Sequence, residues 1–316
     1  MKKIMERLPI PLAGLMLGCA ALGNLLQSYS EAIRYLFGGI SFLLFLLLLL
    51  KLILFPATIK EELKNPITMS VSATFPMGMM LLSVYAKPWL GSVSTAIWFI
   101  AIALHIIMIG IFTYRFLRKL DIKKVFASWF IVYVGIAVAG ITAPAYGMHA
   151  LGTITFWFGL VSLLGLLILV GYRYRKYSAI PEPAQPLFCI FAAPASLCLA
   201  AYIQSVQNKS VLLAATLAVL ASALYLLSLI RLPSFLRLPF YPSYAAFTFP
   251  FVISAIAMKQ LHAYLTGAGY SLPFLSPVIL IETIIAVLLV CYVLVRFTAF
   301  LLQPAPAKAS VADSAK

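Results

Sequence analysis

Residues that could carry out acid–base or metal chemistry are scarce in the apolar part of this chain. Glu282 is the only carboxylate, and His105 the only histidine, that lies inside an apolar segment. Catalysis or metal binding needs several such groups within reach of one another. The sequence therefore predicts no enzyme, no metal site and no cofactor. The cysteines form neither a C-x-x-C pair nor a cluster with histidine, and they are predicted to be structural thiols without a disulfide: Cys19, Cys189, Cys198 and Cys291.

The isolated Glu282 and His105 each allow two interpretations. An ionisable residue inside a membrane is by default a candidate for function. Glu282, however, lies about one and a half turns from the external end of its helix, so it can reach the interface or a neighbouring subunit. A structural role is favoured for Glu282. For His105, a packed or interfacial position is favoured over a metal ligand or a proton relay.

Proline breaks in the apolar segments expose the other polar groups that could have a function. Residues 244–257 read Y-A-A-F-T-F-P-F-V-I-S-A-I-A, an apolar stretch interrupted by Thr248, Phe249 and Pro250. Proline removes a backbone donor and clashes with the preceding turn, so the helix must kink and leave a polar group unpaired. In hydrocarbon, such a group is tolerated only where it faces buried protein or a water-filled path. This segment is therefore predicted to line a path, and similar breaks occur at Phe75-Pro76, Ala143-Pro144 and Ala193-Pro194.

The composition places these breaks in a membrane. Hydrophobic residues make up 64% of the chain and charged residues only 10%, far from the balance of a soluble domain. The chain is predicted to form one transmembrane domain over residues 1–302, followed by a disordered tail at 303–316. A spanning helix takes about 20 apolar residues. By this criterion ten spans are predicted, at 8–27, 32–54, 67–85, 93–116, 125–143, 151–172, 187–205, 211–230, 240–258 and 277–302.

The basic residues indicate how the chain crosses the membrane. Of the 23 lysines and arginines, 19 fall on the side of the N-terminus, and only Arg34, Lys87, Lys209 and Lys259 fall on the other. Cytoplasmic loops carry the excess of basic residues, so both termini are predicted to lie in the cytoplasm of a multi-pass cell-membrane protein. This arrangement explains the net charge of +15 without nucleic acid, and it favours contact with anionic lipid headgroups.

The spans are predicted to pair as five helical hairpins in a quasi-fivefold ring around a central pore. Odd-numbered spans carry the breaks at Pro76, Pro144, Pro194 and Pro250, whereas even-numbered spans are uninterrupted and richer in leucine. The broken helices belong inside, where freed backbone groups can meet water or an ion, and the others belong against lipid or another subunit.

The first inner helix departs from this pattern. It has Pro9 and Pro11 near its cytoplasmic end and Gly14-x-x-x-Gly18 in its body, so small residues permit close backbone approach. The two glycines are candidates for lining the pore, and the alternative that they only pack helices together stays open.

The inner helices present a weakly polar lining without charge. Hydroxyls, backbone dipoles and apolar walls let an ion enter and leave. Each half-helix that follows a break points a partial positive charge at the lumen, which favours anions. The predicted lining and break residues are Gly14, Gly18, Thr74, Phe75, Pro76, Ser83, Thr142, Pro144, Tyr146, Pro194, Ser196, Thr248, Phe249, Pro250 and Ser254.

These features together resemble a known family. The five hairpins, the Phe-Pro and Ala-Pro breaks and the A-F-T-F-P element at 246–250 resemble the tellurite-resistance/dicarboxylate transporter family, which includes bacterial TehA and the plant slow anion channels. The resemblance extends over residues 8–302. It implies a homotrimer with one pore in each subunit, which passes monovalent anions such as chloride and nitrate. It also implies that Phe249 is the gate, and Met16 stands where some members have a proline.

Two other functions remain as alternatives to an anion channel. The first is a secondary carrier or efflux protein for a dicarboxylate such as malate, for sulfite or for tellurite. Carriers of dianions generally need a cation at the site, and no lysine or arginine falls near the middle of an inner helix. The second is a membrane enzyme, which would need a polar constellation that is missing from this sequence.

Overall fold

The protein is a bundle of helices. The structure, a computed structural model, describes residues 2–177 and 179–303, and no strand occurs among them. All of the predicted tail except Gln303 lies outside the described residues. Eight described stretches are long and apolar enough to cross a membrane: Glu31–Leu54, Pro66–Leu90, Ser92–Leu117, His149–Lys176, Glu182–Ser205, Val211–Leu236, Pro242–Gly267 and Leu275–Leu302. Two shorter apolar stretches, Leu12–Leu26 and Gly135–Tyr146, stand at the first and fifth predicted spans.

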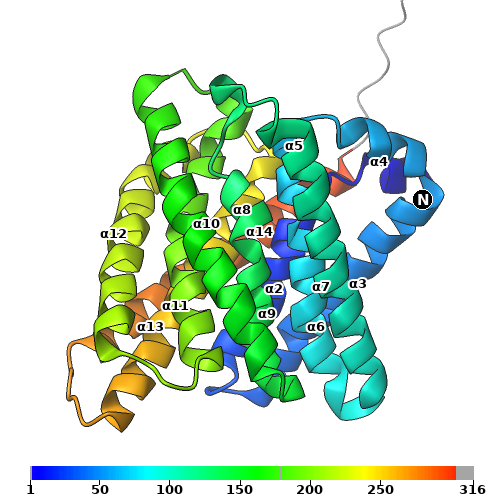
Figure 1. Cartoon of the computed structure of the whole chain (residues 1–316). Coiled ribbons are helices and arrows are strands. Elements are labelled where there is room, and N and C mark those ends of the chain that lie inside the picture. Colours follow the sequence, from blue (N-terminus) through cyan, green and yellow to red (C-terminus); the bar gives the residue numbers. More distant parts are fainter. Residues whose placement is uncertain (1, 178, 304–316) are drawn as a thin grey trace, which may run out of the picture.

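Long helices alternate along the chain with interrupted segments. The long helices are α3 (Glu31–Leu54), α7 (Ser92–Phe112), α10 (His149–Lys176), α12 (Val211–Leu236) and α14 (Leu275–Leu302). Each packs against the segment that precedes it, in the pairs α2 with α3, α6 with α7, α9 with α10, α11 with α12 and α13 with α14. The helices of each pair run antiparallel along the bundle (Figure 1).

The interrupted segments contact one another in a closed order. Their main helices are α2 (Leu12–Leu26), α6 (Thr74–Leu90), α9 (Val138–Thr142), α11 (Ala193–Ser205) and α13 (Phe249–Gly267). α2 contacts α6, α6 contacts α9, α9 contacts α11, α11 contacts α13, and α13 contacts α2 again. The contacts among these five helices therefore form a closed cycle.

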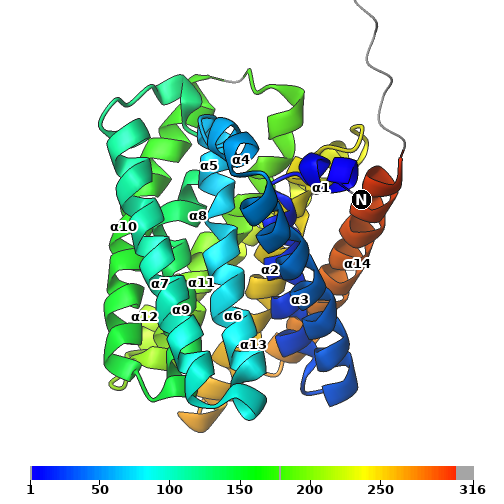
Figure 2. The same ribbon diagram turned by 90° about the vertical axis from the view of Figure 1, so that its right-hand side faces the viewer.

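Short elements identify the two ends of the bundle. Figure 2 shows α1 (Lys2–Arg7) and α4 (Pro56–Glu62) at one end, which we call the N-terminal end. The π-helical turn η1 (Thr113–Leu117) and the 3-10 turn η2 (Ile122–Lys124) follow α7. The connectors at 27–30, 147–148, 206–210 and 268–274 lie at the opposite end (Figure 1).

Three of the predicted breaks are places where the chain ends one helix and begins another. A proline is tolerated in the first turn of a helix, because its missing N–H has no partner there. Pro76, Pro194 and Pro250 all occupy such first turns. The paired elements are α5 (Pro66–Ser72) before α6, η5 (Glu182–Ala192) before α11, and η6 (Pro242–Phe247) before α13.

The other two inner segments differ from the prediction. Pro144 lies in η4 (Ala143–Tyr146) at the opposite end of the bundle. The central interruption of that segment is instead η3 (Gly135–Ala137), which separates α8 (Trp129–Tyr133) from α9 and contains no proline. In the first segment the irregular stretch ends before Leu12, so α2 is regular at Met16. A break at the centre of an inner segment therefore does not require proline.

Burial separates inner from outer helices. In the long interrupted segments, 67–89% of the most apolar window is buried, against 28–39% in α3, α7, α10, α12 and α14. Large apolar side chains such as Phe42, Ile100, Trp157 and Leu226 are exposed on the outer helices. An apolar surface of this extent is stable against lipid or another protein and unstable in water. The five long helices are therefore the outer layer of a membrane protein.

Candidate functional site

Two cavities meet at Phe249. The first, which we call the apolar cavity, has a volume of about 50 Å³. The second, the polar cavity, has a volume of about 290 Å³. Among the described residues, Phe249 is the one residue that lines both cavities. Its ring therefore stands where a path along the bundle would have to pass.

The apolar cavity lies where four inner helices begin. The first turns or N-caps of α2, α6, α11 and α13 contribute Pro11, Thr74, Pro194 and Pro250 to its wall. None of these four helices has a side-chain hydrogen bond at its N-cap. A helix N-terminus carries a partial positive charge, which favours an anion, even where its first N–H groups donate to the preceding turn, as those of Leu12, Ala13 and Gly14 do. The described wall contains no Asp or Glu to oppose that preference.

The polar cavity lies at the opposite end of the bundle. Its wall includes the ends of α2 and α11 and the beginning of α3, and it carries four amide side chains and one arginine: Asn24, Gln27, Gln204, Gln260 and Arg34. Within the described wall there is again no Asp or Glu. The two cavities thus differ in polarity but share a lining without acidic residues.

The backbone around Thr248 positions Phe249. The 3-10 segment η6 ends at Phe247, and α13 begins at Phe249, so Thr248 connects two helical directions. The Thr248 hydroxyl donates to the Ala245 carbonyl at 2.7 Å and lies 3.1 Å from the Gly14 carbonyl. A Cβ on Gly18 would stand 2.6 Å from Thr248 Cβ and 3.1 Å from the Phe249 nitrogen. Gly14 and Gly18 therefore let α2 approach the backbone that carries Phe249, and Gly14 also lines the apolar cavity.

The neighbouring phenylalanines point elsewhere. Phe247 is fully buried and packs on Tyr244, with 4.8 Å between ring centroids. Phe251 is also fully buried and packs on Tyr225 at 5.5 Å. Phe249 is 6% exposed and alone of the three reaches a cavity among those described. This distribution agrees with the expectation that only one of the three rings can face the lumen at this level.

Most of the predicted lining hydroxyls donate to the backbone. Thr74 donates to Val71 O at 2.7 Å, and Thr142 donates to Val138 O at 2.9 Å. Ser196 and Ser254 lie 3.1 Å apart, and both approach the Ala192 carbonyl at the end of η5. Backbone carbonyls at the interruptions are thus satisfied by side chains, whereas the sequence suggested water or an ion. Thr74 and Thr142 still contribute to cavity walls.

Several predicted residues lie away from both cavities. Phe75 points to the outer layer, where its ring stacks on Phe45 of α3 at 5.4 Å. Pro76 and Pro144 are missing from the described walls of both cavities, as are Gly18 and Thr248, which pack behind Phe249. Of the predicted residues, the structure brings together Gly14, Thr74, Pro194, Phe249 and Pro250 at the apolar cavity.

His105 completes an interrupted inner segment. It is fully buried on α7, and its Nε2 lies 2.9 Å from the Val132 carbonyl, just before η3. A carbonyl can only accept, so Nε2 carries the hydrogen of this bond. The histidine thus satisfies a backbone group that the interruption leaves without its usual helical partner. This contact supports the packed role favoured from the sequence.

Glu282 lies within the chain and does not reach the interface. It is 5% exposed, and its Oε2 has no hydrogen-bond partner among the described residues. The hydroxyl of Tyr225 on α12 is likewise buried and unpaired within the described chain. The predicted position at the interface or against a neighbouring subunit is therefore wrong, because the inward face of α14 carries this carboxyl.

The polar cavity could not be predicted from the sequence. Its polar residues are single amides near the ends of separate inner helices, together with Arg34, one of four basic residues on the external side. A usable signal is the recurrence of Gln or Asn near the end of an inner span, at Gln27, Gln204 and Gln260. The interruption at Gly135 was missed for a related reason: it contains no proline.

The fold is that of a helical membrane protein with two internal cavities that share the Phe249 ring. A family model described as voltage-dependent anion channel, the SLAC1 family, matches residues 7–298, and the chain belongs to this family. The match confirms the resemblance seen in the sequence. Members of the family are channels or transporters of anions. A comparison with curated proteins gave no match.

Proposed function

We propose that this protein is an anion channel that passes monovalent anions, such as chloride and nitrate, through a pore in each subunit. The observation that carries the proposal is the position of Phe249 between two cavities that share no other described lining residue. In this proposal the pore runs through both cavities, and the Phe249 ring closes it. No enzymatic activity is proposed.

The closed order of inner helices supports a pore with quasi-fivefold symmetry. Each inner helix contacts the next in the order α2, α6, α9, α11 and α13. Each outer helix packs against the inner helix of the same hairpin. Residues 1–302 then act as one transmembrane domain of ten crossings. The first and fifth crossings are completed by the irregular stretches before α2 and around η3, which are tolerable because they are buried within the protein.

Selection for anions follows from the field along this path. Four helix N-termini point at the apolar cavity, Arg34 lines the polar cavity, and neither described wall has an acidic side chain. Partial charges of this kind attract an anion without binding it so tightly that it stays. A monovalent anion suits such a site better than a dianion, because the apolar cavity wall contains no Lys or Arg.

The distribution of charge and apolar surface supports the rest of the proposal. The excess of basic residues on the connectors at the N-terminal end of the bundle supports a topology in which this end, and both termini, face the cytoplasm. The exposed apolar faces of the outer helices suit lipid and the subunit contacts of a homotrimer. Nucleic acid has no part in this proposal.

Conductance of the Phe249→Ala variant tests the gate. Purified wild-type and variant protein would be recorded in planar bilayers under chloride and nitrate gradients. We expect a large rise in anion current, with a reversal potential that follows the anion gradient. Phe251→Leu is the matched control, because it changes a nearby ring that packs away from both cavities. An unchanged conductance in Phe249→Ala, or an equal rise in Phe251→Leu, would remove the gate assignment.

The same preparations distinguish a channel from a carrier. A carrier for malate, sulfite or tellurite would show saturable uptake into proteoliposomes that depends on a proton gradient. It would show no single-channel openings in current recordings. A channel shows current that rises with voltage and with anion concentration. Saturable, proton-coupled malate uptake by the wild type would reverse the proposal in favour of the carrier.

A further inference from the structure

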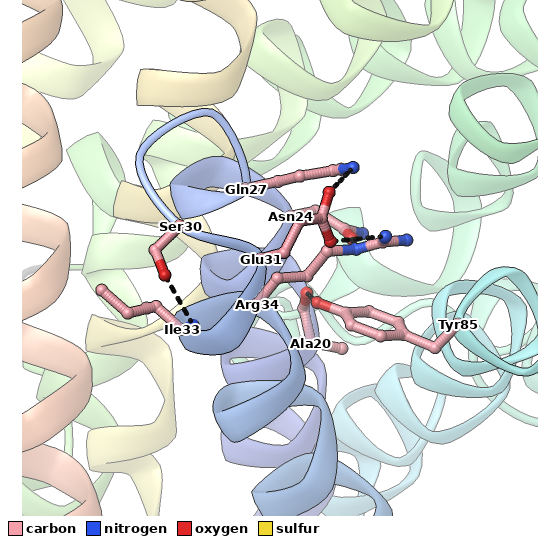
Figure 3. A network of polar contacts seen from close by, with 8 residues as sticks. All are labelled: Ala20, Asn24, Gln27, Ser30, Glu31, Ile33, Arg34 and Tyr85. Carbon is pink, nitrogen blue, oxygen red and sulfur yellow. Dashed lines mark hydrogen bonds and ion pairs between the residues drawn. The ribbon is translucent and has the colours of Figure 1, made fainter.

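The polar cavity contains an arginine that is held in place from three directions. Arg34 Nε donates to Asn24 Oδ1 at 3.4 Å, and Arg34 Nη1 donates to Glu31 Oε2 at 3.4 Å (Figure 3). The guanidinium carbon lies 4.9 Å from the centroid of the Tyr85 ring. Gln27 Nε2 in turn donates to Glu31 Oε1 at 2.8 Å. The side chain of Arg34 is only 13% exposed, so it is part of the cavity wall and not a free surface charge.

Tyr85 is itself fixed beneath the guanidinium. Its hydroxyl donates to the Ala20 carbonyl at 2.8 Å, and its ring lies against α3, where a Cβ on Gly38 would stand 2.6 Å from Tyr85 Cε1. A rigid aromatic face attracts a cation and restricts where it can move. Arg34 is therefore preorganised, which lowers the entropy that binding a ligand would cost.

Donors remain available beside Arg34. Within the described chain, no hydrogen bond uses Arg34 Nη2, and Asn24 accepts with its oxygen, which leaves its amide nitrogen as a donor. Gln260 also lines the cavity, and its buried Oε1 has no hydrogen-bond partner among the described residues. Because the two ends of an amide are assigned from their contacts, the Gln260 side chain can turn its NH₂ toward a ligand. These groups suit an anion.

We propose that the polar cavity is an anion-binding site in which Arg34 binds a small monovalent anion and Glu31 competes for the same guanidinium. Glu31 is the only carboxylate in the sequence that falls on this side of the membrane in the proposed topology, and its side chain is 57% exposed. It takes up Arg34 Nη1 and thereby offsets part of the positive charge. The polar cavity binds anions on the external side of the Phe249 ring. Glu31 weakens this binding, so that the anion can be released. This role rests on the proposed function.

The opposing roles of Arg34 and Glu31 give a test with two directions. Crystals of the wild type soaked in graded bromide should show an anomalous peak within contact distance of the Arg34 guanidinium. In Arg34→Gln the bromide needed to fill this peak halfway should rise about tenfold or more, since a hydrogen bond to a charged group is lost. In Glu31→Gln the bromide concentration that fills the peak halfway should fall about threefold, because the competing carboxylate is neutralised.

Lys259→Gln is the control for charge alone. Lys259 lies at the same end of the bundle, but it donates to the Leu25 carbonyl and to Ser28 and does not line the polar cavity. Its removal should leave the bromide peak within about twofold of the wild type. A missing wild-type peak, a peak that persists unchanged in Arg34→Gln, or weaker binding in Glu31→Gln would each overturn the proposal.

Binding and conduction can fail separately in this design. Bromide occupancy is measured without any current, so a protein that binds bromide but does not conduct would overturn the channel and keep the site. A protein that conducts anions but shows no bromide peak would overturn the site and keep the channel. In a Phe249→Ala background, Arg34→Gln should also reduce anion current severalfold when the anion concentration is low enough to leave the site partly empty.

Discussion

Gly18 of α2 lies directly against Thr248, so that a Cβ on the glycine would stand 2.6 Å from both Thr248 Cβ and Thr248 Oγ1. Thr248 is the residue before the ring that stands between the two cavities, and it joins η6 to α13. The position of Phe249 therefore depends on a helix that is distant in sequence and that has no room for a side chain at this point.

Gly18→Ala should displace the backbone at Thr248 and Phe249. Inserting a methyl group at a closed contact typically destabilises by about 1–3 kcal/mol, and here the strain falls on the proposed gate. We expect a lower unfolding temperature in detergent and a higher basal anion current. Gly39→Ala is the matched control, because a Cβ there meets nothing within 4 Å. Equal basal anion currents in Gly18→Ala and Gly39→Ala would show that the contact between Gly18 and Thr248 does not affect the gate.

The Thr248 hydroxyl should be needed to hold the junction before Phe249. Thr248→Val keeps the shape of the side chain but leaves the Gly14 and Ala245 carbonyls without this donor. The loss of a buried hydrogen bond costs about 1–3 kcal/mol. We expect more frequent openings in single-channel records, and Thr248→Ser should restore wild-type behaviour. Equal opening of the Val and Ser variants would argue against this role of the hydroxyl.

His105 should stabilise the interrupted segment around η3. In His105→Ala the Val132 carbonyl loses its Nε2–H donor, and a void opens beside Gly135. We expect a loss of stability of about 2–4 kcal/mol, from the hydrogen bond and the packing together. Thermal unfolding followed by tryptophan fluorescence would measure this loss. His262→Gln, which changes a half-buried histidine outside both described cavity walls, should have little effect. A similar loss in both variants would contradict the specific role of His105.

Local chemistry explains what could be predicted of this fold. Pro76, Pro194 and Pro250 determine helix starts through their own missing N–H groups, so a break near each could be read without knowledge of its neighbours. The inward position of Phe249 followed from the same break together with the family resemblance. Apolar length likewise predicted the long helices, because a spanning helix needs a continuous apolar run.

Tertiary contacts explain what could not be predicted. The interruption at Gly135 depends on Met77 and His105 from two other helices, since a Cβ there would stand 2.7 Å from Met77 Sδ. Phe75 points outward because α6 begins anew at Thr74, and the direction of each side chain then follows from that start. The polar cavity collects single residues from separate helices, each of which looks like an ordinary helix end in the sequence.

An ion pair that joins buried Lys51 near the end of α3 to Glu62 at the end of α4 should be more important for stability than an exposed pair beside it. The side chain of Lys51 is only 1% exposed. Its Nζ donates to Glu62 at 2.7 Å and to the Leu8 carbonyl at 2.6 Å, so it ties α3 to α4 and to the chain before α2. Glu62→Ala would leave a buried ammonium with a carbonyl as its only described partner. We expect a loss of about 3 kcal/mol.

The adjacent Glu61 provides the matched control for that change. It pairs with Lys64 at 2.6 Å, but both side chains are largely exposed, so Glu61→Ala should change stability by less than about 1 kcal/mol. The double variant Lys51→Met with Glu62→Ala should recover part of the loss, because no buried charge then remains. Thermal unfolding of the three variants in one detergent measures the ranking. If Glu61→Ala and Glu62→Ala were equally stable, the Lys51–Glu62 pair would not anchor α4.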